Sequence, residues 1–184
     1  ITLSEQVKVL LDTDAHLLTP NEVIKKILSA KVDLIWNGGI GTFVKAAIET
    51  NLEVGDFAND AIRINGRELN ARMVCEGGNL GLTQLGRVES EQFGARLNTD
   101  FVDNSAGVDC SDHEVNIKIL LDQVVSAGEL SVDQRNLMLE SMSDDVATLV
   151  LNNNYMQNQT ISFVTHNSRH SCLLYTSPSP RDTL

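Results

Sequence analysis

The stretch of residues 104–114 reads NSAGVDCSDHE, and the interpretation of the whole chain starts from it. It follows a short run, residues 100–103, that we expect to contain a strand. Small residues then lead to Ser111, and Glu114 three positions later completes a capping box ahead of an apolar series. The pattern predicts a strand end that feeds a helix N-terminus, where the backbone can approach a ligand closely.

Alternating helical and strand patterns continue on both sides of this stretch. The predicted strands are residues 32–36, 72–75 and 101–103. The predicted helices cover residues 4–11, begin at Thr19-Pro20, cover 82–89, run from Ser111 to about Ala127, and start again at Ser131 and near Ser143. Short apolar runs are typical of a parallel sheet, so the chain is expected to be α/β.

Composition narrows the classes of function. A net charge of -11 argues against nucleic acid as the partner, because phosphate binding needs clustered Lys and Arg. The negative charge does not argue against binding of a dinucleotide, since backbone N–H groups can hold its pyrophosphate. The sequence contains no apolar run of about 20 residues, and its three cysteines have no disulfide spacing. We therefore expect a cytoplasmic protein with free thiols and no membrane partner.

Two further glycine-containing motifs accompany the first stretch. Residues 36–42 read WNGGIGT and residues 76–83 read EGGNLGLT. Together with residues 104–114 they resemble the cofactor-domain half of the large, NAD-specific bacterial glutamate dehydrogenases, from about Ile1 to Phe163. In the wider amino acid dehydrogenase superfamily the corresponding motifs are E-G-A-N and N-A-G-G-V-x-x-S.

The resemblance implies a fold and its divisions. Residues 1–127 would form a partial NAD-binding, Rossmann-like domain, the back half of a mostly parallel sheet, and residues 128–163 a helical segment. No G-x-G-x-x-G follows a strand, and three strands are too few for a complete doubly wound sheet. Residues 164–184 are expected to be a disordered tail. Within it, residues 172–182 resemble a translated sequencing adapter, and the alternative is a natural Ser/Pro-rich tail.

The resemblance also implies cofactor contacts. Asn79 follows a strand in a Gly-flanked turn, and its spacing alone favours an ordinary turn residue. By its match to the E-G-A-N motif, Asn79 resembles the residue that contacts the nicotinamide-side ribose. By its match to N-A-G-G-V, Asn104 resembles the residue that orients the nicotinamide. The expected NAD-binding residues are Asn37, Gly38, Gly39, Gly77, Gly78, Asn79 and Asn104.

Two residues are expected on the substrate side. Val108 resembles the residue that lines the aliphatic chain of the substrate. Ser111 is expected to cap a helix and, by resemblance, to contact the side-chain carboxylate of L-glutamate or 2-oxoglutarate. Among other amino acid dehydrogenases, an apolar residue at this place suits leucine or phenylalanine.

No catalytic residue is assigned. The superfamily uses a Lys and an Asp from glycine-rich motifs that are not found here, and Lys45 is the only lysine beside a presumed cofactor loop. Cys110 and His113 are two ligands short of a zinc site, so no metal is expected.

The sequence is accordingly interpreted as a fragment of an NAD-dependent glutamate dehydrogenase, inactive alone and homo-oligomeric as the intact enzyme. The alternatives are another amino acid dehydrogenase of the same superfamily and a non-catalytic nucleotide-binding α/β module. An upstream Lys/Asp pair would exclude the second alternative.

Overall fold

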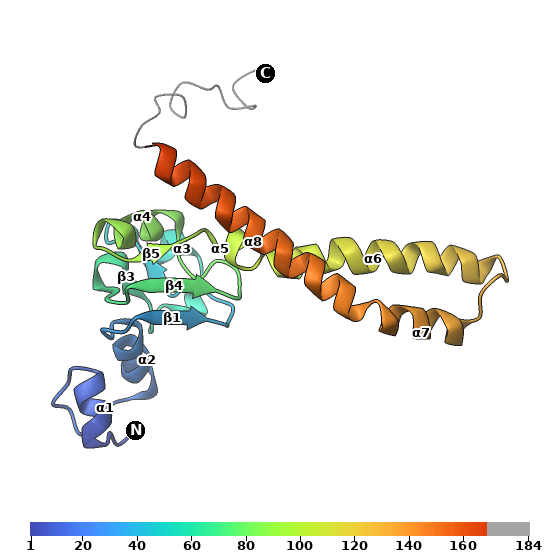
Figure 1. The fold of residues 1–184 in the computed structure, drawn as a ribbon. Coiled ribbons are helices and arrows are strands. Elements are labelled where there is room, and N and C mark those ends of the chain that lie inside the picture. Colours follow the sequence, from blue (N-terminus) through green and yellow to red (C-terminus); the bar gives the residue numbers. More distant parts are fainter. Residues whose placement is uncertain (169–184) are drawn as a thin grey trace. The chain divides into compact units, whose positions relative to one another are not determined.

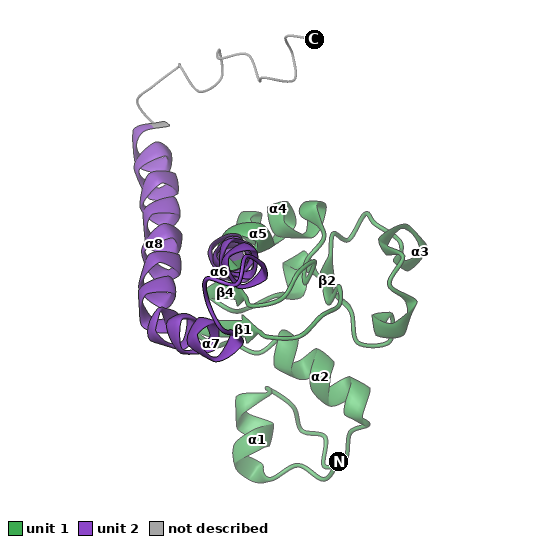
Figure 2. Ribbon diagram, turned by 90° about the vertical axis from the view of Figure 1, so that its right-hand side faces the viewer, with its two compact units in different colours: residues 1–104 green, residues 105–184 purple. Residues whose placement is uncertain are grey.

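A computed structural model describes residues 1–168 of the chain, drawn as a ribbon in Figure 1. The chain divides into two compact units. The first is Ile1–Asn104 and the second begins at Ser105, as the colours of Figure 2 show. The border lies at Asn104, whereas the sequence predicts that the cofactor domain extends to residue 127.

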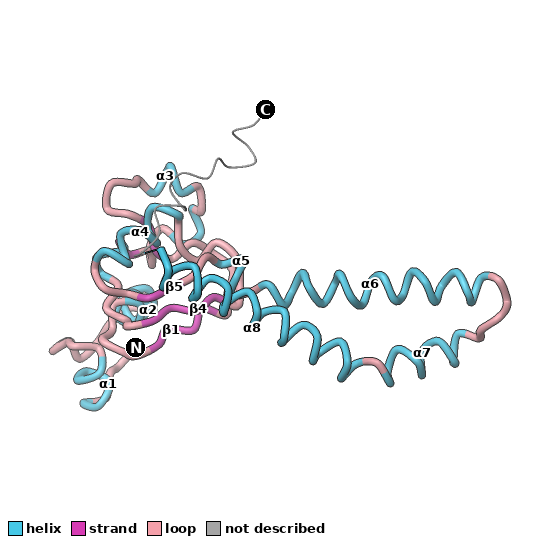
Figure 3. The backbone as a smooth tube through the Cα atoms, turned by 45° about the horizontal axis from the view of Figure 1, so that its top comes forward, coloured by secondary structure: helices cyan, strands magenta, loops and turns pink. Residues whose placement is uncertain are grey.

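Three parallel strands form the main sheet of the first unit, and Figure 3 shows them in magenta. They are β1 (Leu34–Asn37), β4 (Met73–Glu76) and β5 (Arg96–Leu97), in the spatial order β1-β4-β5. The predicted strands 32–36 and 72–75 are confirmed as parallel neighbours, each shifted toward the C-terminus by one or two residues. Asn37 pairs with Glu76, so the two strands end together.

Shorter elements complete this unit. The helices are α1 (Glu5–Leu10), α2 (Pro20–Leu28), α3 (Asn51–Val54), α4 (Gln84–Gln92) and α5 (Asp100–Asp103), with 3-10 turns η1 (Phe57–Asn59) and η2 (Gly66–Glu68). A second parallel pair joins β2 (Val44–Lys45) to β3 (Ile64–Asn65). The unit is α/β, as expected.

One face of β1 and β4 packs into the core. Val74 is buried in a cluster with Val44, Ile64, Leu69 and Leu82, and Ala71 and Ala95 complete it. Successive side chains of a strand point to opposite faces, so Ile35 shares the core side with Val74. Leu34 and Trp36 are exposed on the other face.

Three helix starts predicted from the sequence are confirmed, at Ser4, Thr19 and Ser131. The Thr19 hydroxyl accepts from the Glu22 N–H, the Glu22 carboxylate accepts from the Thr19 N–H, and Pro20 opens α2. Ser131 caps α7 (Val132–Ser141) with the same reciprocal pair of contacts, made with Gln134, whereas the Ser4 hydroxyl accepts from the Val7 N–H at the start of α1. These contacts lie within four residues of sequence, which is why the sequence alone predicts them.

The third predicted strand is wrong. Residues 101–103 belong to α5, a single turn that starts after Thr99, and Val102 is its buried residue. Two apolar residues between aspartates have no readable period, so burial of Val102 on a helical turn produces the same pattern as a strand. The strand beside β4 is instead β5, whose sequence is Arg96-Leu97.

The second unit is helical. It contains α6 (Ser105–Ser126), α7 (Val132–Ser141) and α8 (Ser143–Ser168). Asn153 on α8 donates to Asp109 on α6 at 2.9 Å, and Arg135 on α7 pairs with Asp122 on α6 at 2.7 Å. Gly128 follows α6 with a φ of 78°, a left-handed conformation that ends helices and favours glycine.

The helix predicted to start at Ser111 starts six residues earlier, so Ser111 lies inside α6 and caps nothing. Its hydroxyl donates instead to the Gly107 carbonyl, one turn back, at 3.4 Å. Glu114 pairs with Lys118 one turn on, rather than with the Ser111 backbone. The S-x-x-E motif matches a capping box. Extending a helix that has begun at Ser105 nevertheless costs less free energy than nucleating a new helix at Ser111.

At the other end, α8 continues past residue 164, where the sequence predicts a tail, and extends to Ser168, the last residue that the structure describes. The adapter-like residues 172–182 lie outside the described part of the chain. Within residues 1–168, no helix combines the length and apolar character needed to cross a membrane.

Candidate functional site at the carboxyl ends of the parallel strands

The loops that follow β1 and β4 lie against each other. The Gly77 N–H donates to the Asn37 carbonyl at 2.8 Å. A Cβ on Gly78 would lie 2.4 Å from the carbonyl oxygen of Gly39, closer than any side chain tolerates. Glycine is therefore required at Gly78 for the two loops to approach as they do.

Helix α5 and its C-cap hold the second loop from another side. The Asn104 amide donates to the Gly78 carbonyl at 2.8 Å and to the side-chain oxygen of Asn79. The Asp100 carboxylate accepts from the Leu80 N–H at 2.8 Å, and Leu80 has a φ of 61°. Such a left-handed conformation persists only where neighbouring contacts impose it.

The seven residues predicted to bind the cofactor thus lie together at one edge of the sheet. Asn37, Gly38 and Gly39 end β1 or follow it, Gly77, Gly78 and Asn79 follow β4, and Asn104 reaches them from the end of α5. Ligands of open α/β sheets bind at this edge. That these residues bind NAD stays a prediction.

Trp36 is a neighbour that we did not single out from the sequence. Its side chain is 64% exposed, and the indole occupies the space that a Cβ on Gly77 would fill, with Cζ2 2.7 Å from that position. Its Nε1 lies 3.2 Å from the corresponding position on Gly38. Trp36 is the only tryptophan of the chain, so its fluorescence reports on both loops.

A buried ion pair was also missed. Glu76, the last residue of β4, is 1% exposed, and its Oε2 lies 2.5 Å from Nη2 of Arg87 on α4. Burial raises the pKa of Glu76 because it disfavours the charged carboxylate, and Arg87 opposes this only in part. The sequence offered one signal for this pair: Glu76 is a charged residue at the end of an apolar strand, and a buried charge needs a partner.

We expect Glu76→Gln to remove a pH dependence of stability. A carboxyl with a raised folded pKa stabilises fully below its ordinary value of 4.5, and that contribution is lost as pH rises through the folded value. The unfolding free energy of the wild type minus that of Glu76→Gln should therefore fall as the pH is raised from the ordinary value of 4.5 through neutral pH. Urea titrations across this range measure it, and a rising difference would contradict the raised pKa.

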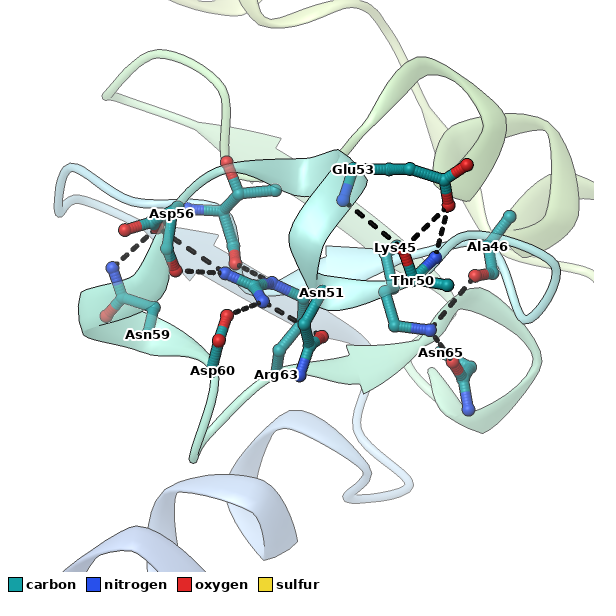
Figure 4. A network of polar contacts seen from close by, with 11 residues as sticks. Lys45, Ala46, Thr50, Asn51, Glu53, Asp56, Asn59, Asp60, Arg63 and Asn65 are labelled. Atoms are coloured by element: carbon teal, nitrogen blue, oxygen red, sulfur yellow. Dashed lines mark hydrogen bonds and ion pairs between the residues drawn. The ribbon is translucent and has the colours of Figure 1, made fainter.

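The first loop is anchored at its far end by a buried arginine (Figure 4). Arg63 Nε donates to the Thr42 carbonyl at 2.8 Å, and Nη2 donates to the Asp56 carbonyl at 2.6 Å. Nη1 donates to Asn51 at 3.0 Å and pairs with Asp60. The Thr42 N–H donates to Asp56 at 2.8 Å, and this contact, with Asn59 and Arg63, lowers the pKa of Asp56.

Lys45, the lysine nearest the loops in sequence, is engaged elsewhere. Its Nζ donates to Asn65 Oδ1 at 2.8 Å and to the Ala46 carbonyl at 3.2 Å, as Figure 4 shows. These contacts join β2 to β3. The geometry supports a structural role and gives no reason to assign Lys45 to catalysis.

The other reactive side chains have structural contacts as well. His113 Nε2 lies 3.7 Å from Asp109, within α6, and 3.4 Å from Asn153. Burial and the charge of Asp103 raise the pKa of the Cys75 thiol, which keeps it in the unreactive protonated form. Residues 1–168 contain no group of three His, Cys, Asp or Glu side chains arranged to hold a metal.

The two residues expected to contact substrate lie in the helical unit. Val108 is exposed on α6, and Ser111 is exposed one turn later. Because Ser111 is inside α6, the expected pairing of a cap with a carboxylate site at a helix N-terminus is wrong. Its contact with substrate stays a prediction.

Replacing Ser111 by alanine is now expected to stabilise the chain slightly, by about 0.5 kcal/mol, because alanine is the better helix former in an exposed helix interior. A lost cap would instead destabilise by about 0.5–2 kcal/mol. Urea unfolding followed by circular dichroism separates these outcomes by sign. A lower unfolding free energy for Ser111→Ala would contradict the position of Ser111 within α6.

Comparison with known proteins agrees with the three motifs. Residues 1–164 match the family model described as bacterial NAD-glutamate dehydrogenase, catalytic domain. The chain is 59% identical over 161 residues to the NAD-specific glutamate dehydrogenase of Halomonas elongata, covering 88% of this chain. It is 53% identical over 175 residues to that of Pseudomonas aeruginosa and 54% identical over 164 residues to that of Mycobacterium tuberculosis, covering 95% and 86% of this chain.

The chain spans about a tenth of the length of these relatives, 10% for two of them and 11% for the Pseudomonas aeruginosa protein. The matched region contains all three motifs and both loops of the candidate site. The chain therefore belongs to the bacterial NAD-glutamate dehydrogenase family, within the catalytic domain.

Proposed function

We propose that the strand-end loops of this chain hold the nicotinamide-ribose half of NAD in an NAD-specific glutamate dehydrogenase. The contact that carries the proposal joins Asn104, Gly78 and Asn79, because it fixes two amide side chains beside a glycine backbone at the ligand-binding edge of a parallel sheet. Amides donate and accept, so they suit both ribose hydroxyls and a carboxamide.

The residues present fit this part of the cofactor. Gly39 and Gly78 carry no side chains, and nothing lies within 4 Å of a Cβ placed on Gly39, so a flat ring or a ribose could approach the backbone there. No G-x-G-x-x-G motif for the pyrophosphate occurs in the sequence. We therefore interpret the sheet β1-β4-β5 as the back half of a Rossmann-like domain, completed by other parts of the catalytic domain.

The proposed reaction converts L-glutamate, NAD⁺ and water into 2-oxoglutarate, ammonium, NADH and a proton. NAD, when bound, accepts the hydride from the substrate Cα. The contribution of this chain is orientation, since Asn79 and Asn104 would fix the ribose and the carboxamide. Val108 and Ser111 are proposed on the substrate side, supported by the family's motif, and the intact enzyme is proposed to be a cytoplasmic homo-oligomer.

The test uses a chimeric enzyme, defined as the Halomonas elongata enzyme with its matching segment replaced by that of this chain. Asn79→Ala should raise the KM for NAD about 3- to 10-fold, the effect of one lost hydrogen bond. Asn104→Ala should lower kcat by about 100-fold, because it displaces the carboxamide and releases Asn79. Initial rates with each substrate varied in turn measure both constants.

Asn21→Ala is the matched control, since Asn21 is an exposed asparagine on α2, outside the candidate site. It should leave both constants within about twofold of the parent chimera. If Asn79→Ala and Asn104→Ala behave like Asn21→Ala, the loops do not hold the cofactor. If the chimera turns over another amino acid faster than glutamate, the substrate assignment fails while the cofactor assignment stands.

A further inference from the structure

The buried pair of Glu76 and Arg87 stands where several parts of the site meet. Besides Glu76, the Arg87 guanidinium contacts the Asn98 carbonyl at 2.8 Å and Asp100 at 3.7 Å. Arg87 therefore links the end of β4 to α4 and to the start of α5. Asp100 in turn holds Leu80 in the second loop.

The carboxylate of Glu76 also lies against the second loop, at Gly81. A Cβ on Gly81 would lie 2.2 Å from Oε1 of Glu76 and 2.1 Å from the amide nitrogen of Asn37. The two side chains therefore converge on the backbone of Gly81. The Glu76 N–H donates to Asp103 at 3.0 Å, which fixes the same residue from the side of α5.

Stability alone does not explain a charged pair here. Exchanging a buried ion pair for apolar side chains of similar size is often neutral or stabilising, because both charges lose their hydration. The raised pKa of Glu76 agrees with this, since the folded protein binds the proton more tightly than the unfolded chain does. A role in placing the backbone accounts for the pair.

We propose that Glu76 and Arg87 are positioning residues that set where the loop of Gly77, Gly78 and Asn79 lies relative to the β1 loop. The proposal rests on the proposed function for the identity of the ligand, and on the contacts of Glu76 and Arg87 for the placement. Neither residue needs to touch NAD. Glu76 acts through the strand end, and Arg87 acts through Glu76 and Asp100.

The first measurement uses the 184-residue chain without cofactor. Trp36 occupies the space beside Gly77 and Gly38, so its emission maximum and its quenching by acrylamide report on loop placement in the folded protein. The double variant Glu76→Met/Arg87→Met should shift the emission and raise the quenching while its thermal midpoint stays at or above that of the wild type. Glu76→Gln, of the same shape, should move the emission in the same direction.

The second measurement places the same variants in the chimeric enzyme. The double variant should raise the KM for NAD about tenfold, comparable to losing one good hydrogen bond, and change the KM for glutamate less. Arg72→Met is the matched control, since Arg72 pairs with Asp33 at 2.9 Å in an exposed ion pair at the opposite ends of the same two strands. It should alter neither the emission nor the kinetics.

The outcomes separate this inference from the proposed function. Altered Trp36 emission in the 184-residue double variant, together with an unimpaired Asn79→Ala variant of the chimera, would support the positioning role and overturn the cofactor assignment. Unchanged emission and an unchanged KM for NAD in the double variant would overturn the positioning role. If the double variant does not fold, Glu76→Gln decides, and wild-type emission in that variant overturns the proposal.

Discussion

Arg63→Met should lower the unfolding free energy of the chain by about 3 kcal/mol, the largest stability effect that we expect from a single substitution. The Arg63 side chain is fully buried, and its removal leaves the Thr42 carbonyl and the Asp60 carboxylate without this donor, while the Asp56 carbonyl keeps only the Asn59 N–H at 3.2 Å. Removing one partner of a buried charge set typically costs about 3–5 kcal/mol. The lower value applies because Asp56 and Asp60 are partly exposed.

Urea unfolding monitored by Trp36 fluorescence measures the loss. Arg72→Met is again the matched control, because its exposed ion pair with Asp33 should contribute within about 0–1 kcal/mol. A midpoint for Arg63→Met equal to that of Arg72→Met would show that the network in Figure 4 contributes nothing to stability. Through Thr42, the same variant should also loosen the β1 loop and raise the quenching of Trp36.

Gly78→Ala should lower kcat/KM for NAD in the chimeric enzyme by about 100-fold, the loss typical of a misplacement of about 1 Å near the reacting groups. The added Cβ would lie 2.4 Å from the carbonyl oxygen of Gly39, and backbone cannot give way as a flexible side chain does. The two loops must then separate, which displaces Asn79 and strains its contact with Asn104.

Gly39→Ala tests the same loop pair without the clash, since nothing lies within 4 Å of a Cβ at that position. Its effect should be at least tenfold smaller than that of Gly78→Ala. Equal effects would mean that the loops respond to added volume in general rather than to their close approach. The E-G-A-N motif of the superfamily has alanine at the position of Gly78. In this chain, the close approach of the Gly39 backbone is the feature that requires glycine there.

The sequence by itself determined the features that depend on short-range contacts. The capping boxes at Thr19 and Ser131 join residues three apart, so the residue types alone predict them. The strands β1 and β4 were readable because each is an apolar run before a glycine-rich loop. Their parallel pairing follows from the general preference of such runs, and it places the motif asparagines and glycines at one edge.

Only the tertiary structure decided the features that depend on what a segment packs against. A short apolar run at 101–103 became α5 because a single helical turn buries Val102, and the helix N-terminus moved from Ser111 to Ser105. The local sequence at Ser111 matches a capping box, but in the structure α6 continues through this residue. Helix propagation is cooperative, so the first residue is set by the whole segment rather than by one motif.

The charged residues that shape the site also required the tertiary structure. Arg63 reaches Thr42 across 21 positions, and Arg87 pairs with Glu76 from the helix that follows the loop. A charge in a sequence is ordinarily a solvated surface residue, and only burial shows that it must have a partner. The sequence therefore identified the loops and their family, whereas the fold decided which side chains hold those loops in place, because burial and pairing depend on segments far apart in the chain.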